Sequence, residues 1–210
     1  MCIRDRLISV LSIQPGDPKG YYFNDPRKKA LREMFRHFPF ASMARFCVAD
    51  EDGSYNSAYK LCRTISNYRE GFIEVVPDDI LLSWADVSDE NDKQARVEFL
   101  ARTCRLLEHD MAGMREPTGF RELASKLAAI SPDPSGILSI FAERAVGNSF
   151  VGSIADHIRF RRRFLDNLDL DDRAETQRGL EQARAYLDRR IESEQTREDA
   201  EAKASAERFE

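Results

Sequence analysis

The segment from Pro77 to Met111 constrains the fold of this chain most, because it contains two helix signals separated by an acidic turn. Ahead of the turn, Pro77 and the two aspartates that follow it suit a helix start, and Trp84 belongs to the short apolar face that comes next. After the turn, apolar residues recur at steps of three and four, which places them on one helical face. They are Val97, Leu100, Ala101, Cys104, Leu107 and Met111. The segment predicts a helix–turn–helix hairpin whose two faces need neighbours for burial.

Similar signals precede this hairpin. Asp25-Pro26 combines a capping residue with a first-turn proline, and the helix that it opens is expected to end before Pro39. The apolar stripe of that helix consists of Leu31, Met34, Phe35 and Phe38. Ala41–Val48 is a second apolar stretch, and another helix is expected from Ser54. Phe72–Val76 is predicted to be a short extended or buried connector.

Three more helices are expected after the hairpin. Thr118 is in position to cap the first, and Asp133-Pro134 repeats the cap-then-proline signal for the second, which Gly147 ends. Ser153–Leu168 is the third. The predicted inward-facing residues are, in chain order, Phe120, Leu123, Leu127 and Ile130; Ile137, Leu138, Phe141 and Ala145; and Ile154, Ile158, Leu165 and Leu168.

The composition changes from Asp171 onward. Residues 166–210 include 14 acidic and 8 basic side chains, a local net charge of −6. A sparse apolar stripe continues and then stops; it consists of Leu180, Ala183, Leu187 and Ile191. We expect one long helix over 172–209 that packs over its first half and frays over its second. Beyond Ser193, a disordered charged tail is the alternative.

Together these patterns predict an all-α fold, built as a solenoid-like stack of helical hairpins that ends in a long charged helix. The expected layout is an extended segment and loop over 7–24, a helical domain over 25–170 and the charged helix over 171–210. The first six residues, MCIRDR, resemble the translation of a sequencing adapter. On that interpretation residues 1–6 are not native, and the chain is expected to be a C-terminal fragment.

Composition narrows the classes of protein that this chain fits. A hydrophobic content of 42% argues against global disorder, and a net charge of −5 argues against general nucleic-acid binding. No apolar run approaches the roughly 20 residues of a membrane-spanning helix, so no membrane partner is expected. Cys47, Cys62 and Cys104 lie far apart in apolar contexts, which favours buried reduced thiols in a cytoplasmic protein.

Residues that suggest chemistry have simpler explanations. GNSFVG at Gly147–Gly152 has one residue too many for a nucleophile elbow and follows a predicted helix rather than a strand. Ser153 and Asp156 suit helix capping better than a hydrolytic set with His157. The three histidines are too dispersed for a metal site, and the acidic loop at 50–53 does not fit a calcium-binding register. We therefore predict no catalytic residue, no cofactor and no metal site.

Two basic patches are the candidate interaction sites. The first, within Asp25–Arg45, consists of Arg27, Lys28, Lys29, Arg32, Arg36 and Arg45, of which Arg27, Lys28 and Arg32 are the candidate interaction residues. The second consists of Arg159, Arg161, Arg162 and Arg163. Phe160 and Phe164 alternate with the second patch, a pattern that also suits single-stranded nucleic acid. The alternative is that these arginines are solvated faces that cover the edge of the core and pair with nearby carboxylates.

Two segments of the chain carry a family resemblance. They are FIEVVPDDILLSWADVSDENDKQARVEFLA at Phe72–Ala101 and FAERAVGNSFVGSIADHIRFRRRFLDNL at Phe141–Leu168. They resemble the C-terminal helical scaffold regions of large multidomain bacterial proteins of the STAND-type and SIR2-associated class. The resemblance implies a helical sensor or scaffold arm attached to an upstream effector, and it carries over no catalytic residue.

The leading hypothesis is therefore a non-enzymatic interaction scaffold, the C-terminal arm of a larger cytoplasmic protein. Its partner would be another protein or the missing upstream domain. On this hypothesis, alanine at Arg161 and Arg162 weakens docking and leaves folding intact. The alternatives are a nucleic-acid-binding helical module that uses the two basic patches, and a small enzyme with an unrecognised site.

Overall fold

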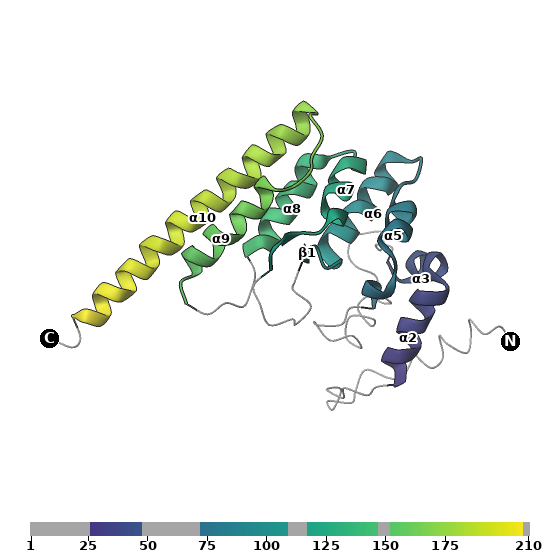
Figure 1. The fold of residues 1–210 in the computed structure, drawn as a ribbon, viewed down its shortest axis with the longest axis horizontal. Coiled ribbons are helices and arrows are strands. Elements are labelled where there is room, and N and C mark those ends of the chain that lie inside the picture. Colours follow the sequence, from purple (N-terminus) through teal and green to yellow (C-terminus); the bar gives the residue numbers. More distant parts are fainter. Residues whose placement is uncertain (1–25, 48–71, 109–116, 147–151, 208–210) are drawn as a thin grey trace. The chain divides into compact units, whose positions relative to one another are not determined.

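The computed structural model describes residues 26–47, 72–108, 117–146 and 152–207. Within these residues the chain forms eight α-helices, one 3-10 helix and one two-stranded sheet, so the predicted all-α class is confirmed (Figure 1). Contacts divide the chain into two compact units, Met1–Trp84 and Ala85–Glu210. This boundary falls inside the hairpin expected over 77–111, and the solenoid-like stacking of hairpins stays a prediction.

The first unit contains four described elements. They are α2 (Pro26–His37), α3 (Pro39–Phe46), the 3-10 helix η1 (Ile73–Val75) and α5 (Asp78–Ala85), whose last residue meets the boundary. Leu31, Phe35 and Met43 are fully buried where α2 meets α3. The Phe35 ring lies 5.9 Å from Phe46 and 4.8 Å from Phe72, measured between centroids, so aromatic contacts form the centre of this small core.

One local prediction in this unit is wrong, and another left two alternatives of which one is confirmed. Phe38 is 63% exposed instead of joining the apolar stripe of α2, because α2 ends at His37 and Phe38 has the non-helical backbone of the α3 N-cap. The connector Phe72–Val76, predicted to be extended or buried, is buried at Phe72, Ile73 and Val76. It is not extended, because the chain turns through the 3-10 helix at this point.

The second unit contains the remaining elements. They are α6 (Glu90–Thr103), β1 (Leu107–Glu108), β2 (Gly119–Phe120), α7 (Glu122–Ile130), α8 (Pro134–Val146), α9 (Ile154–Asp166) and α10 (Ala174–Ala206). Helix α8 is central, because it contacts α6, α7, α9 and α10. All four of its predicted inward residues, Ile137, Leu138, Phe141 and Ala145, are fully buried. The predicted start of α8 is also confirmed, since the backbone N–H of Gly136 donates to Asp133 Oδ1 at 3.0 Å.

Between α6 and α7 the chain forms a strand pair that the sequence pattern does not predict. Helix α6 ends at Thr103 instead of continuing to Met111, which lies outside the described residues. Leu107 then pairs with Phe120 in antiparallel register. Thr118 does not cap α7, whose N-cap is Arg121; its backbone N–H instead donates to the carbonyl of Glu108 at 2.9 Å. The helical spacing of Leu107 is therefore overridden by backbone pairing with a distant segment.

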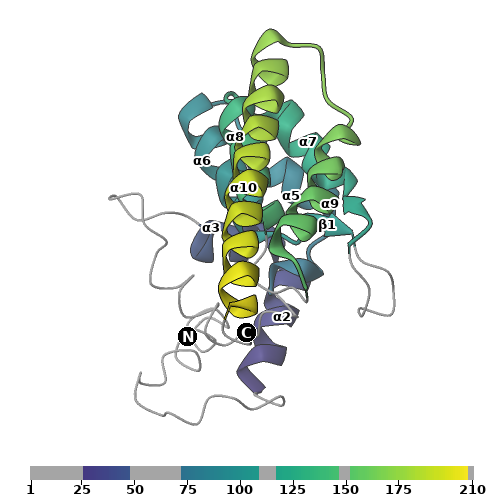
Figure 2. The ribbon, with the colours of Figure 1, turned by 90° about the vertical axis from the view of Figure 1, so that its left-hand side faces the viewer.

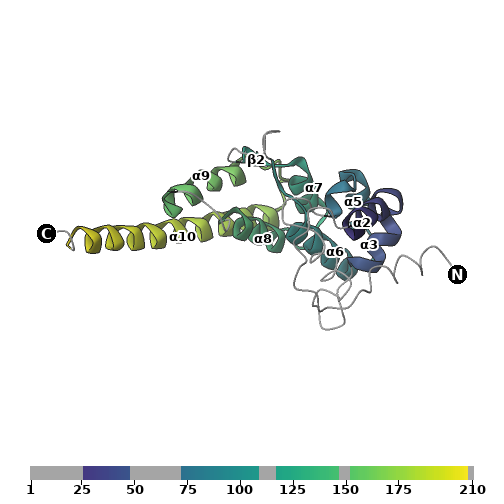
Figure 3. The same ribbon diagram turned by 90° about the horizontal axis from the view of Figure 1, so that it is seen from below.

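Helix α10 is 33 residues long, or about 50 Å at 1.5 Å per residue. It runs antiparallel to α9 and packs on both α8 and α9 (Figure 1), and Figure 2 shows it in front of α8 with α9 beside it. Leu180, Ala183 and Leu187 are buried, as the stripe predicts. The helix continues past the start of α9 to Ala206, and its last turns are fully exposed (Figure 3). The long charged helix is thus confirmed.

The cysteines and several predicted segments differ in whether the described residues include them. Cys47 and Cys104 are buried, as predicted, whereas Cys62 lies outside the described residues. The helix expected from Ser54, the stop at Gly147 and the segment 7–24 also lie outside them. Within the described part of the chain, no helix has the length and apolar character that crossing a membrane requires.

Candidate functional site

The α9–α10 seam, where these two antiparallel helices face each other, brings the second basic patch against α10. Polar contacts join the helices along their length, and they pair early residues of α9 with late residues of α10. In order they are Ser153 with Glu198, Arg159 with Gln195, Arg162 with Asp188, and Asp166 with Arg184. The seam is therefore a ladder of side-chain contacts at the edge of the apolar core.

The start of α9 is held by groups from both helices. Gly152, with a φ of +96° that favours glycine, precedes Ser153, whose Oγ accepts from the backbone N–H of Asp156 at 3.0 Å. From α10, Glu198 Oε1 accepts the N–H of Ile154 at 2.6 Å, and its Oε2 accepts the Ser153 hydroxyl at 2.8 Å. These hydrogen bonds, with Ser153 the largest cause, lower the pKa of Glu198 below its ordinary value.

Arg162 makes the central contact of the seam. Its Nε and Nη2 donate to the two carboxylate oxygens of Asp188 at 2.5 and 3.1 Å, and its Nη1 lies 3.5 Å from Asp166 Oδ2. This fork-to-carboxylate geometry is the strong form of an arginine pair. The hydrogen bond that Arg162 donates to Asp188 raises the pKa of Arg162 above its ordinary value, because the carboxylate favours the charged guanidinium.

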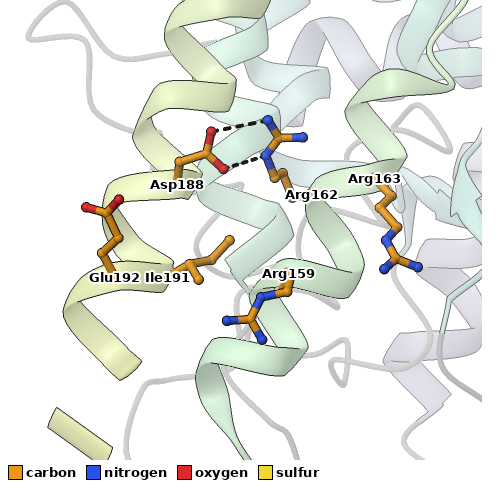
Figure 4. Close-up of a pocket in the computed structure, with 6 residues that line it drawn as sticks. All are labelled: Arg159, Arg162, Arg163, Asp188, Ile191 and Glu192. Carbon is orange, nitrogen blue, oxygen red and sulfur yellow. Dashed lines mark hydrogen bonds and ion pairs between the residues drawn. The ribbon is translucent and has the colours of Figure 1, made fainter. Parts of the chain in front are cut away.

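An open groove of about 480 Å³ lies over this pair. Its lining residues are Arg159, Arg162, Arg163, Asp188, Ile191 and Glu192 (Figure 4). The first three extend from α9 and the others from α10. The groove therefore combines an apolar side chain, Ile191, with charges of both signs.

The outward face of α9 adjoins the groove and is formed by Asp156, Arg159, Phe160 and Arg163. Their spacing of three, four and seven residues from Asp156 places them on one side of the helix, and all four are exposed. Phe160 is 40% exposed, and its ring packs edge-on against buried Phe164 at a centroid distance of 5.2 Å. This face presents an aromatic ring that is anchored from below and flanked by two arginines.

The predicted interaction residues differ in their surroundings. Arg159 pairs with Asp156 and contacts Gln195, while Arg161 is half-buried and donates to the carbonyl of Ala145 at 3.4 Å. Arg162 is bonded into the seam, and Arg163 points away from it at the far side of α9 (Figure 4). The second patch thus divides into two pairs: Arg161 and Arg162 are half-buried, whereas Arg159 and Arg163 are exposed.

The first basic patch belongs to a different unit from the second. Arg32 is half-buried on α2 in the first unit, whereas the α9 arginines belong to the second unit. The side chains of Arg27 and Lys28 lie outside the described residues. The structure therefore gives the first patch no site geometry.

The residues that sequence reasoning missed all come from α10. They are Asp188, Glu192 and Glu198, and they are joined by Ile191, which was predicted as a stripe residue but not as part of a site. Their signal is weak, because the stripe identifies Ile191 on the packed side of the helix but does not single out the charged residues beside it. Which charged residue of α9 each one meets depends on the antiparallel register of the two helices, and periodicity does not contain that information.

A metal-centred site finds no support in the part of the chain that the structure describes, where no three His, Cys, Asp or Glu side chains converge. Comparison with protein-family models, with curated proteins and with solved structures finds no match to this chain.

Proposed function

We propose that this chain is a non-enzymatic interaction module that docks a protein partner on the outward face of α9. The observation that carries the proposal is the exposed ring of Phe160 between Arg159 and Arg163, on a helix whose opposite side is packed. Arginine and aromatic side chains are enriched where proteins bind each other, and they dominate the binding energy there.

Rigidity of the site adds to this support. Phe160 rests on Phe164, and Phe164 in turn lies 6.4 Å from Phe120, so the exposed ring is the outer member of an aromatic chain that leads into the core. The start of α9 is fixed by Ser153 and Glu198. A surface that is already ordered loses little conformational entropy when a partner binds.

The arginines proposed to contact the partner differ from those expected from the sequence. Arg161 and Arg162 make contacts inside the unit, so alanine at these positions is expected to weaken the packing of α9 in addition to any docking. Arg159 and Arg163 take over the interaction role, because they lie on the exposed face. This replaces the expectation that changes at Arg161 and Arg162 leave folding intact.

Nucleic-acid binding is the competing function, because an aromatic ring between arginines suits a base and its phosphates. The same surface, however, carries Asp156, Asp188 and Glu192, which repel a phosphate backbone. We therefore favour a protein partner. A gel shift of the full chain with single-stranded DNA at low salt, lost on Arg163→Glu, would reverse that preference.

The wider setting follows from two expectations. The resemblance to bacterial scaffold regions suggests that the module is an arm of a larger protein. Cys47 and Cys104 are buried, and the expectation that they are reduced thiols suits a cytoplasmic location.

Photo-crosslinking tests the proposed function. A photoreactive amino acid replaces Phe160 in the full chain expressed in bacterial cells, and a matched control carries it at Arg178, an exposed position of α10 about four turns before Glu192. We expect a discrete protein adduct from position 160 that is lost when Arg163→Glu is added. Equal adducts from both positions, or none from position 160, would refute the docking role.

A further inference from the structure

The groove over the α9–α10 seam contains two opposite charges that the seam itself does not neutralise. Arg162 bonds Asp188, and Arg159 pairs with Asp156. Arg163 and Glu192 also line the groove, and neither side chain forms an ion pair with any described residue. Figure 4 shows the two at opposite edges of the groove, Arg163 on the side of α9 that is away from α10 and Glu192 on the side of α10 that is away from α9.

We propose that this groove is the interface between two copies of the chain related by a two-fold axis. In such an interface each contact occurs twice with the roles exchanged, so Arg163 of each copy meets Glu192 of the other. An axis through the middle of the groove, between these two side chains, produces that exchange. This inference rests on the proposed function and names its partner as a second copy.

Other binding partners would neutralise only some of the charges that line this groove. An acidic peptide or a phosphate backbone neutralises Arg163 but places a like charge near Glu192 and Asp188. A basic partner neutralises Glu192 but places a like charge near Arg159 and Arg163. A second copy contributes its own Arg163 and Glu192, one charge of each sign. Their separation is the same in both copies, so both charges can be paired at once.

Apolar contact and charge have separate roles in this dimer. Exposed ion pairs contribute little energy by themselves, so the attraction comes from Phe160, Ile191 and the apolar stems of the arginines. The two Arg163–Glu192 pairs determine register and exclude wrong arrangements. Reversing one charge is therefore expected to weaken the dimer more than removing it.

Charge reversal tests the pairing directly. Sedimentation equilibrium of the full chain, from low to high micromolar concentration, compares the wild type with Arg163→Glu, Glu192→Arg and the double variant. Each single variant is expected to weaken self-association by about tenfold or more, because it creates two like-charge contacts per dimer. The double variant is expected to recover it, and an equimolar mixture of the two single variants is expected to form a mixed dimer.

Matched controls are Arg178→Glu and Glu181→Arg, which change the same charges at exposed positions of α10 outside the groove. They should self-associate like the wild type, and circular dichroism should show unchanged helix content in every variant. A monomeric wild type, single variants that dimerise normally, or a mixture that fails to associate would each overturn the dimer. If the chain is monomeric while position 160 still crosslinks a different protein, the proposed function survives and the dimer does not.

Discussion

The two halves of α10 are held to the protein in different ways. In the first half, Leu180, Ala183 and Leu187 are buried against α8 and α9. In the second half every residue from Glu192 to Ala206 is exposed or half-buried, and the contact with α9 depends on the Glu198 carboxylate and on Gln195. Both halves are helical, so helix formation alone does not distinguish apolar attachment from polar attachment.

This difference matters because the two kinds of attachment respond to different changes. Apolar burial depends on shape and volume, whereas a carboxylate that accepts backbone hydrogen bonds depends on pH and on a single side chain. The second half is also stabilised by local ion pairs of Arg197 with Glu194 and Glu201, each worth a few tenths of a kcal/mol. The comparison yields four predictions, from the largest effect to the smallest.

Leu187→Ala should have the largest effect, because the side chain is fully buried beneath the first half of α10. We expect a loss of about 2–5 kcal/mol in the free energy of unfolding of the second unit. Urea unfolding followed by circular dichroism measures this loss, with Ser193→Ala in the exposed half as the control. If the two variants unfold alike, the apolar attachment of the first half is not as described.

Gly179→Ala tests the close packing of α10, because helix propensity and packing predict opposite effects for this change. In an exposed helix this change stabilises by roughly 0.5–1 kcal/mol. Here the added Cβ would lie 2.6 Å from the backbone Cα of Ser135 in α8, and backbone gives way less easily than a side chain. We expect a net destabilisation of about 1–3 kcal/mol in urea unfolding. A stabilised variant would show that α10 and α8 are less closely packed.

The sequence predicted the parts of this arrangement that depend on local periodicity. The α8 face, the Ser153 cap, the Asp133-Pro134 start and the Leu180–Leu187 stripe follow from residues within a few positions of each other, and the structure confirms them. Leu107 has the same helical spacing as Leu100, yet it pairs with Phe120. Its backbone partner lies in a distant segment that no local pattern identifies.

The candidate site was predictable only in part for the same reason. The sequence identifies Arg159–Arg163 as a patch, but it does not show that Arg162 turns inward while Arg163 turns outward. That division depends on Asp188, 26 positions further along the chain. Likewise, Glu198 belongs to a stretch of apparently featureless charge, and its role at the start of α9 depends on the antiparallel packing.

The Arg162–Asp188 pair should contribute less than the apolar contacts. The two side chains are 28% and 47% exposed, so solvent screens them. A double-mutant cycle with Arg162→Ala and Asp188→Ala should give a coupling free energy of about 1 kcal/mol that decreases with added salt. Additive single effects would mean that the pair does not hold the seam together.

The Glu198 contact should produce a pH dependence that Glu198→Gln removes. The pKa of Glu198 is lowered in the folded chain, so its contribution is fully present above the unfolded value of 4.5 and is lost as pH falls through the lower folded value. The stability difference between wild type and Glu198→Gln should therefore shrink on acidification below 4.5. Urea unfolding at a series of pH values measures this difference. A difference that stays constant with pH would contradict the hydrogen bonding of the Glu198 carboxylate to the start of α9.

Amide hydrogen exchange along α10 tests the contrast between its halves most directly. Amides between Thr176 and Ile191 should exchange only through unfolding of the whole unit, whereas those after Ser193 should exchange faster through local opening. Glu198→Gln should speed exchange in the second half and at the start of α9, and leave the first half unchanged. Uniform protection across α10, or equal acceleration of both halves by Glu198→Gln, would contradict this account.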